Sequence, residues 1–132
     1  MQLRVVALVL TSLSLSAASL ATSFAGTYTS LRKDNEGILV GYEIALEMTS
    51  NGQFQAKVRC AYGNAGKRTT LRATVNGNKL ELAENTTDEN LCPDGKFVGT
   101  IDFQQITGQF QDPAQLPSNW ITERLKRVPS RQ

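Results

Sequence analysis

The chain of 132 residues contains no histidine. Histidine is the side chain that most often moves protons near neutral pH, and it is the commonest metal ligand. No Gly-x-Ser-x-Gly sequence is present to hold a nucleophilic serine. We therefore predict a protein that is not an enzyme, with no catalytic residues, no metal site and no cofactor.

The chain also lacks a strong charge of either sign. It carries 14 Lys and Arg against 12 Asp and Glu, a net charge of +2, which gives no electrostatic basis for binding nucleic acid. The basic excess from Arg124 to Arg131 is interpreted as a solvated tail, with a patch for an anionic partner or membrane surface as the alternative.

No apolar run reaches the roughly 20 residues that cross a bilayer. Arg4 is the one charge among the first 31 residues, and the apolar run Val5–Leu10 and then small residues follow it. This order is typical of a secretory signal peptide. The sequence predicts a signal peptide over residues 1–21, cleaved after Ala21 or Ala25, and a single domain over 22–132. We expect an exported, soluble protein, periplasmic or extracellular, without a transmembrane segment after cleavage.

Alternation of apolar and polar side chains dominates the mature chain. It runs from Val40 to Met48 and again from Gln53 to Tyr62, on either side of the Asn-Gly pair at 51–52. Asn-Gly between two alternating runs is a strong hairpin signal. The pattern recurs around the Asn-Gly pair at 76–77 and from Phe97 to Phe103.

These runs predict an all-β fold, a small antiparallel up-and-down β-barrel or a sandwich, with seven or eight strands. Gly26–Thr29 is expected to be the first strand. The segment from Trp120 to Val128 fits both a helix and a closing strand. We favour the strand slightly because everything upstream is antiparallel sheet.

In an oxidising compartment a lone pair of cysteines most often forms a disulfide. Cys60 and Cys92 would close a loop of about 33 residues, which the chain-entropy account values at about 3–4 kcal/mol. We predict this disulfide as a major source of stability.

One set of alternating side chains is expected to point into the barrel. In an eight-stranded barrel such side chains most often fill the interior, and we favour that interpretation over a pocket for a small apolar ligand. If a pocket exists, the predicted ligand-binding residues are Tyr42, Met48, Phe54, Tyr62, Phe97 and Phe103.

The two ends of the mature chain carry a weak family resemblance. The start has Gly26-Thr27-Tyr28, and Arg124 and Arg127 lie near the end. This resembles small secreted barrels of the calycin type, the lipocalins, avidins and fatty-acid-binding proteins. They open with Gly-x-Trp, and the aromatic ring packs near an arginine of the last strand. Tyr28 stands where the tryptophan would be. The resemblance implies an up-and-down barrel with one end open to a ligand.

The carboxylates offer little chemistry. Glu43 and Glu47 share one strand face, but it is the polar face, so we interpret them as solvated. The acidic residues of the loop 84–95 do not have the spacing of a calcium-binding loop. The sequon at 85–87 matters only in a eukaryotic secretory pathway.

The leading hypothesis for function is an exported, non-enzymatic binding protein that contacts a protein or envelope component, for example as an inhibitor of a secreted enzyme. The alternative is a carrier of a small apolar ligand inside a calycin-like barrel. An enzyme is the third and least supported hypothesis.

Overall fold

The computed structural model describes residues 24–85 and 94–129, so the predicted signal peptide over 1–21 lies outside the described residues. The strands are β1 (Gly26–Thr29), β2 (Arg32–Lys33), β3 (Leu39–Met48), β4 (Phe54–Ala65), β5 (Thr69–Asn76), β6 (Lys79–Leu82), β7 (Lys96–Ile101), β8 (Gln105–Gln111) and β9 (Thr122–Arg127). A 3-10 helix, η1 (Pro117–Asn119), lies between β8 and β9.

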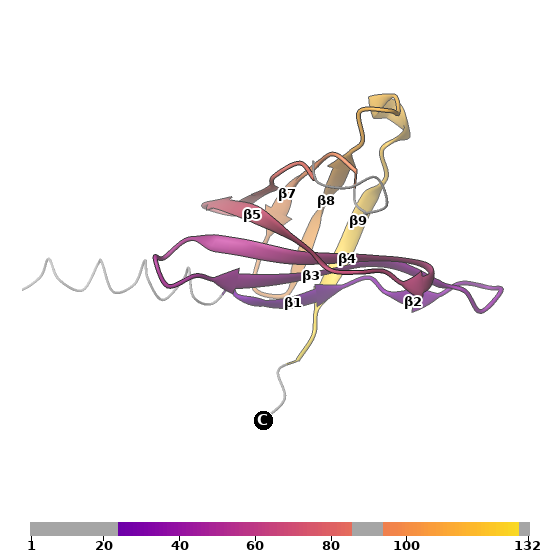
Figure 1. Ribbon diagram of the computed structural model, residues 1–132, viewed down its shortest axis with the longest axis horizontal. Helices are drawn as coiled ribbons and strands as arrows, with labels where there is room; N and C mark the ends of the chain where they lie inside the picture. The colour runs from indigo at the N-terminus through magenta and orange to yellow at the C-terminus, as the bar shows by residue number, and fades with distance from the viewer. Residues whose placement is uncertain (1–23, 86–93, 130–132) are drawn as a thin grey trace, which may run out of the picture.

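The strands form a closed barrel. From β3 to β9 each strand pairs antiparallel with the next along the chain, and β1 pairs with both β9 and β3. This double pairing of β1 closes an eight-stranded ring, and β2 adds an extra strand on β3. In Figure 1, β1, β3 and β4 run across the view, while β7, β8 and β9 cross it steeply. The predicted all-β antiparallel fold is confirmed, as a barrel rather than a sandwich.

The predicted hairpins are present. β3 and β4 pair over ten positions, from Leu39 opposite Gly63 to Met48 opposite Phe54. The turns contain Gly52 and Gly77, which have φ angles of 80° and 65°. Because glycine has no Cβ, it adopts this left-handed conformation without strain, so both Asn-Gly pairs close their hairpins as predicted.

The ambiguous segment near the C-terminus is a strand. β9 pairs with β8 from Gln105 opposite Lys126 to Gln109 opposite Thr122. Leu125 is fully buried between exposed neighbours, which is the period-2 pattern of a strand with one face in the core. The barrel needs this strand to join β8 to β1, so the tertiary pairing excludes the helix.

Apolar side chains from every strand of the closed ring fill the middle of the barrel. The fully buried ones include Tyr28, Ile44, Val58, Leu80, Leu82, Phe97, Ile106 and Leu125. They belong to one packed cluster. Gly99 and Gly108, opposite each other on β7 and β8, leave the space that the Phe97 ring occupies, because a Cβ on Gly108 would lie 2.6 Å from Phe97 Cζ.

Three side chains expected to point inward do not enter the barrel. Tyr62 is 89% exposed, since it lies on β4 beyond Val58, the last residue that pairs with β5. Phe103, 46% exposed, lies in the turn between β7 and β8, and Met48, 36% exposed, ends β3. In each case the alternation of the sequence continues past the point where the barrel ends.

The predicted disulfide stays a prediction. Cys60 lies on β4, opposite Tyr42 of β3, but Cys92 lies outside the described residues.

Candidate binding site at the open end of the barrel

The barrel has two unlike ends. At one, which we call the closed end, short turns at 49–53, 77–78 and 102–104 join neighbouring strands. The amide of Ile101 donates to the Asn78 carbonyl at 2.8 Å, so two of these turns adjoin. At the other, the open end, lie the short connection 66–68 and several longer ones, among them residues 112–121 with η1. Figure 1 shows this connection standing out beyond the strands.

Arg127 covers the closed end. Its guanidinium donates from Nη2 to the Ala25 carbonyl at 2.6 Å and from Nη1 to the Phe103 carbonyl at 3.2 Å. Arg127 Cζ also lies 5.7 Å from the centre of the Tyr28 ring, within the range of a cation–π contact. Arg127, not the exposed Arg124, therefore makes the arginine–aromatic contact that the calycin resemblance implies.

A groove of about 220 Å³ lies at the open end. Aromatic and acidic side chains supply most of its wall. Its principal lining residues are Tyr42, Phe110, Trp120, Asp94, Asp112 and Glu123. They come from β3, β8, β9 and the connections beside them, so closure of the barrel brings together residues far apart in the chain.

Two aromatic rings form the apolar part of this groove. The rings of Tyr42 and Phe110 lie 4.7 Å apart, centre to centre, and the Phe110 ring contacts Phe97 edge-on at 4.9 Å. Phe97 is fully buried in the core. The floor of the groove is therefore continuous with the packed interior and has a fixed shape.

The loop after β8 is fixed by its own hydrogen bonds. The indole Nε1 of Trp120 donates to the Asp112 carbonyl at 3.0 Å. The Asp112 carboxylate accepts from the Ala114 amide at 2.9 Å, and the Trp120 amide donates to the Pro117 carbonyl at 3.2 Å. These bonds hold the Trp120 ring over the groove.

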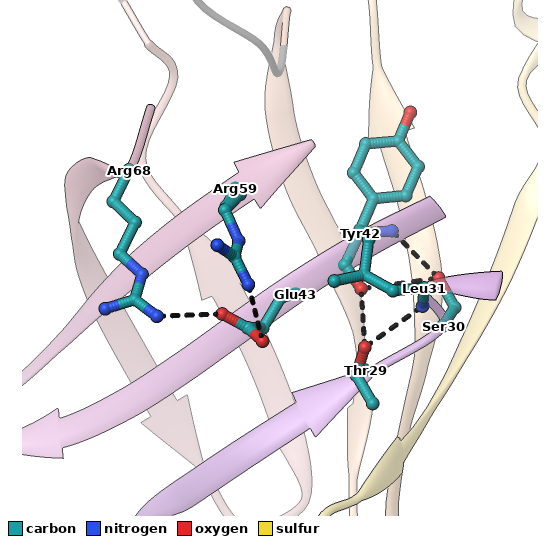
Figure 2. Close-up of polar contacts among 7 residues, drawn as sticks. All are labelled: Thr29, Ser30, Leu31, Tyr42, Glu43, Arg59 and Arg68. Carbon is teal, nitrogen blue, oxygen red and sulfur yellow. Dashed lines mark hydrogen bonds and ion pairs between the residues drawn. The ribbon is translucent and has the colours of Figure 1, made fainter. Parts of the chain in front are cut away.

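The backbone of Tyr42 is anchored across β1 and β3. Its amide donates to Ser30 Oγ at 3.0 Å, and its carbonyl accepts from the Ser30 amide at 2.8 Å (Figure 2). Gly41 beside it has a φ of 114°, and a Cβ there would collide with the Ser30 carbonyl. Glycine at this position thus permits the close approach that orients Tyr42.

The groove carries negative charge. Burial raises the pKa of the Tyr42 hydroxyl above its ordinary value of 10.0, and the carboxylates of Glu123 and Asp94 raise it further. Burial also raises the pKa of the Glu123 carboxyl above its ordinary value of 4.5, an effect that the nearby Arg32 opposes. Among the described residues, no lysine or arginine lines the groove.

A second, wider groove of about 600 Å³ adjoins the first and shares Tyr42 and Glu123 with it. It lies along β2, β3 and the outer part of β4, where Arg32, Cys60 and Tyr62 contribute to its lining. The two grooves together make the open end a broad, hollowed surface.

The six residues predicted for a ligand pocket are not brought together. Tyr42 and Phe97 lie toward the open end, and Tyr62 lines the second groove. Met48 and Phe54 line a separate hollow beside Val75. The Phe103 ring stacks on Phe24 at 5.1 Å, at the closed end.

The two carboxylates considered for catalysis are held in ion pairs on the outer face. Glu43 lies between Arg59, at 3.2 Å, and Arg68, at 3.3 Å, and Figure 2 shows the Tyr42 ring directed away from it. Glu47 pairs with Lys57 at 3.6 Å. Among residues 24–85 and 94–129, no three His, Cys, Asp or Glu side chains are grouped so as to hold a metal ion.

The sequence alone does not predict this groove. Of its principal lining residues, the sequence predicts only Tyr42 as a ligand-binding residue; Phe110, Asp94, Asp112 and Glu123 belong to no recognisable motif. The one available signal was the single tryptophan, Trp120, after the segment from Pro113 to Pro117. Tryptophan is enriched where an apolar surface meets water.

The fold and this groove define an all-β protein with a closed eight-stranded antiparallel barrel, one sealed end and one open end. This is consistent with a calycin-like architecture. Comparison of the chain with models of protein families, with curated proteins and with solved structures finds no match. In the described part of the chain, no helix has the length and apolar character needed to cross a membrane.

Proposed function

We propose that this is an exported, non-enzymatic binding protein that holds a protein partner at the open end of its barrel. The observation that carries the proposal is where its most exposed large apolar side chains lie. Tyr62, Ile121 and Leu116 are 89%, 71% and 68% exposed, more than any other large apolar side chain among the described residues.

These three side chains all belong to the open end. Ile121 lines the first groove and Tyr62 the second, while Leu116 precedes η1 in the same connection as Ile121. Exposed apolar side chains that gather beside a hollow are typical of protein interaction sites. The outer faces of β3 and β4 carry ion pairs. The apolar side chains Met48, Phe103 and Val128 at the closed end are less exposed, at 36%, 46% and 41%, and are less suited to a stable contact.

Binding at this surface has more support than transport of a small apolar ligand inside the barrel. The interior is occupied by the packed cluster around Phe97, Leu80 and Leu82. An apolar surface that could contact a ligand is therefore found at the ends of the barrel. Native mass spectrometry of freshly purified protein separates the two functions. A carrier would show extra mass that organic extraction removes, whereas we expect the mass of the protein alone.

The proposal is tested by capture from the envelope and secreted fractions of the source cells with three immobilised proteins. They are the processed chain, an open-end variant with Tyr62, Leu116 and Ile121 changed to serine, and a matched closed-end variant with Met48, Phe103 and Val128 changed to serine. All six are exposed apolar residues. We expect a stoichiometric protein that the processed chain and the closed-end variant retain and the open-end variant loses. Failure to recover any such protein, or equal retention by both variants, would overturn the proposal.

A further inference from the structure

We propose that the first groove of the open end receives a cationic side chain, an arginine or lysine, that the partner inserts between Trp120 and the Tyr42–Phe110 pair. This inference rests on the proposed function for the statement that the cation belongs to a protein. The groove itself is defined by residues of this chain, so its preference for a cation is tested separately.

The sign of the charge in the groove selects the ligand. Three carboxylates, those of Asp94, Asp112 and Glu123, contribute to its lining, and no basic side chain from the described part of the chain does. The ion pairs within the described residues are those of Glu43 and Glu47, and none involves these three carboxylates. Arg32 lies beside Glu123 in the second groove and donates to the Ser30 carbonyl at 3.1 Å. An incoming cation would therefore find acceptors that have no ion-pair partner of their own.

The aromatic rings favour the same ligand. A guanidinium or ammonium group is attracted to the face of an aromatic ring, most strongly to tryptophan, and the attraction increases as water is removed. The groove offers the rings of Trp120, Tyr42 and Phe110 beside its carboxylates. The alkyl stem of an arginine or lysine would pack against Ile121 at the rim, since these side chains bury their stems on apolar surface.

The size of the groove suits one side chain. Its volume of about 220 Å³ is below the roughly 300–1,000 Å³ of typical small-molecule sites. The exposed Ile121 and Leu116 beside it extend the contact beyond the groove. A protein that inserts one cationic side chain and packs its surroundings on these apolar residues fits both features.

Trp120 is the only tryptophan in the chain, so tryptophan fluorescence, excited selectively over that of the tyrosines, reports from the groove alone. We would titrate the processed protein with N-acetyl-arginine methylamide and, at matched ionic strength, with the citrulline derivative, which keeps the shape but has no charge. We expect a saturable fluorescence change with the arginine derivative that weakens as salt is added, and no saturable change with citrulline.

Glu123→Gln and Asp94→Asn together remove two of the negative charges with little change of shape. We expect this double variant to bind the arginine derivative at least about fivefold more weakly, as expected for loss of charge at short range. Glu81→Gln, on the exposed face of β6, is the matched control and should bind as the unchanged protein does. Equal responses to arginine and citrulline, or unchanged binding by the double variant, would overturn the inference.

The two proposals fail in different ways. If the groove shows no preference for the cation while the open-end serine variant still loses a captured partner, the partner binds there without a cationic side chain. If the groove binds the arginine derivative but no partner is captured, the cation site stands and the protein-binding function falls.

Discussion

The two ends of this barrel are built from the same strands and have opposite characters. At the closed end the charged group of Arg127 reaches two backbone carbonyls and an aromatic ring. At the open end three carboxylates line the groove with Tyr42 and Trp120, without an ion pair among the described residues. The cation of the closed end has partners within the protein, whereas the carboxylates of the open end line a groove that is open to solvent.

This difference separates stability from binding. A buried or half-buried charge is tolerated in a fold when it has partners, and it destabilises the fold when it lacks them or loses them. Changes at the closed end are therefore expected to affect unfolding strongly, and changes at the open end to affect binding more than unfolding. The predictions that follow test this division, from the largest expected effect to the smallest.

The largest expected effect on stability is an exception to this division between the ends, because it concerns Cys60, which lines the second groove at the open end. Cys60→Ser removes the predicted disulfide to Cys92, and we expect a loss of about 2–5 kcal/mol of stability. Thermal unfolding followed by circular dichroism measures it, with the reduced unchanged protein as a control. An unchanged melting curve, together with an intact mass heavier by two hydrogen atoms than the oxidised chain, would mean that the thiols are not joined.

Arg127→Ala should destabilise the closed end by about 2–3 kcal/mol. It removes two hydrogen bonds from a charged donor and a cation–π contact. Arg124→Ala is the matched control, since Arg124 is an exposed arginine of the same strand, and we expect its effect to stay within about 0.5 kcal/mol. Chemical denaturation of both variants tests this, and similar losses would refute the special role of Arg127.

The contrast between the ends also marks what the sequence can predict. Period-2 alternation and the two Asn-Gly turns predict local pairing, because they depend on neighbours within one hairpin. They predicted the β3–β4 hairpin and the strands β5, β6 and β7. The C-terminal strand β9 was ambiguous locally, since Leu125 and its neighbours fit two periods, and only its pairing with β8 and β1 decides between them.

The groove escaped prediction for the same reason. Tyr42, Asp94 and Glu123 are far apart in the chain, and they share a surface only because the barrel closes. Conversely, Tyr62 and Phe103 continue the inward pattern of β4 and β7, but Tyr62 lies beyond the pairing of β4 with β5 and Phe103 lies in the turn after β7, so both are exposed. The alternation predicts which face of its strand a residue lies on. Whether that face is buried depends on how the strands close into the barrel.

A smaller effect on stability is expected from one hydrogen bond near the closed end. The Tyr28 hydroxyl donates to the Phe24 carbonyl at 2.8 Å, and Tyr28→Phe removes that bond with the ring kept. We expect a loss of about 1 kcal/mol, the net value of a typical hydrogen bond. Tyr62→Phe, at an exposed ring, should leave the denaturation midpoint unchanged. Equal midpoints for all three proteins would show that the bond does not contribute.

The smallest effect concerns the open end and depends on pH. Burial raises the pKa of the Glu123 carboxyl in the folded state above its ordinary value of 4.5. The folded protein then binds this proton more tightly than the unfolded chain, so stability falls as pH rises through the raised pKa. Glutamine does not ionise and avoids that loss. We therefore expect Glu123→Gln to melt slightly higher than the unchanged protein at neutral pH, and the difference to disappear below pH 4.5.

Melting temperatures of both proteins across this pH range test the sign, with Glu81→Gln as the control on an exposed face. A Glu123→Gln variant that melts lower at neutral pH would mean that the carboxylate stabilises the fold, as Arg127 does at the other end. A variant that melts higher and also binds the arginine derivative more weakly would mean that this carboxylate serves binding at the expense of stability. Such a result would place stability and binding on opposite ends of one barrel.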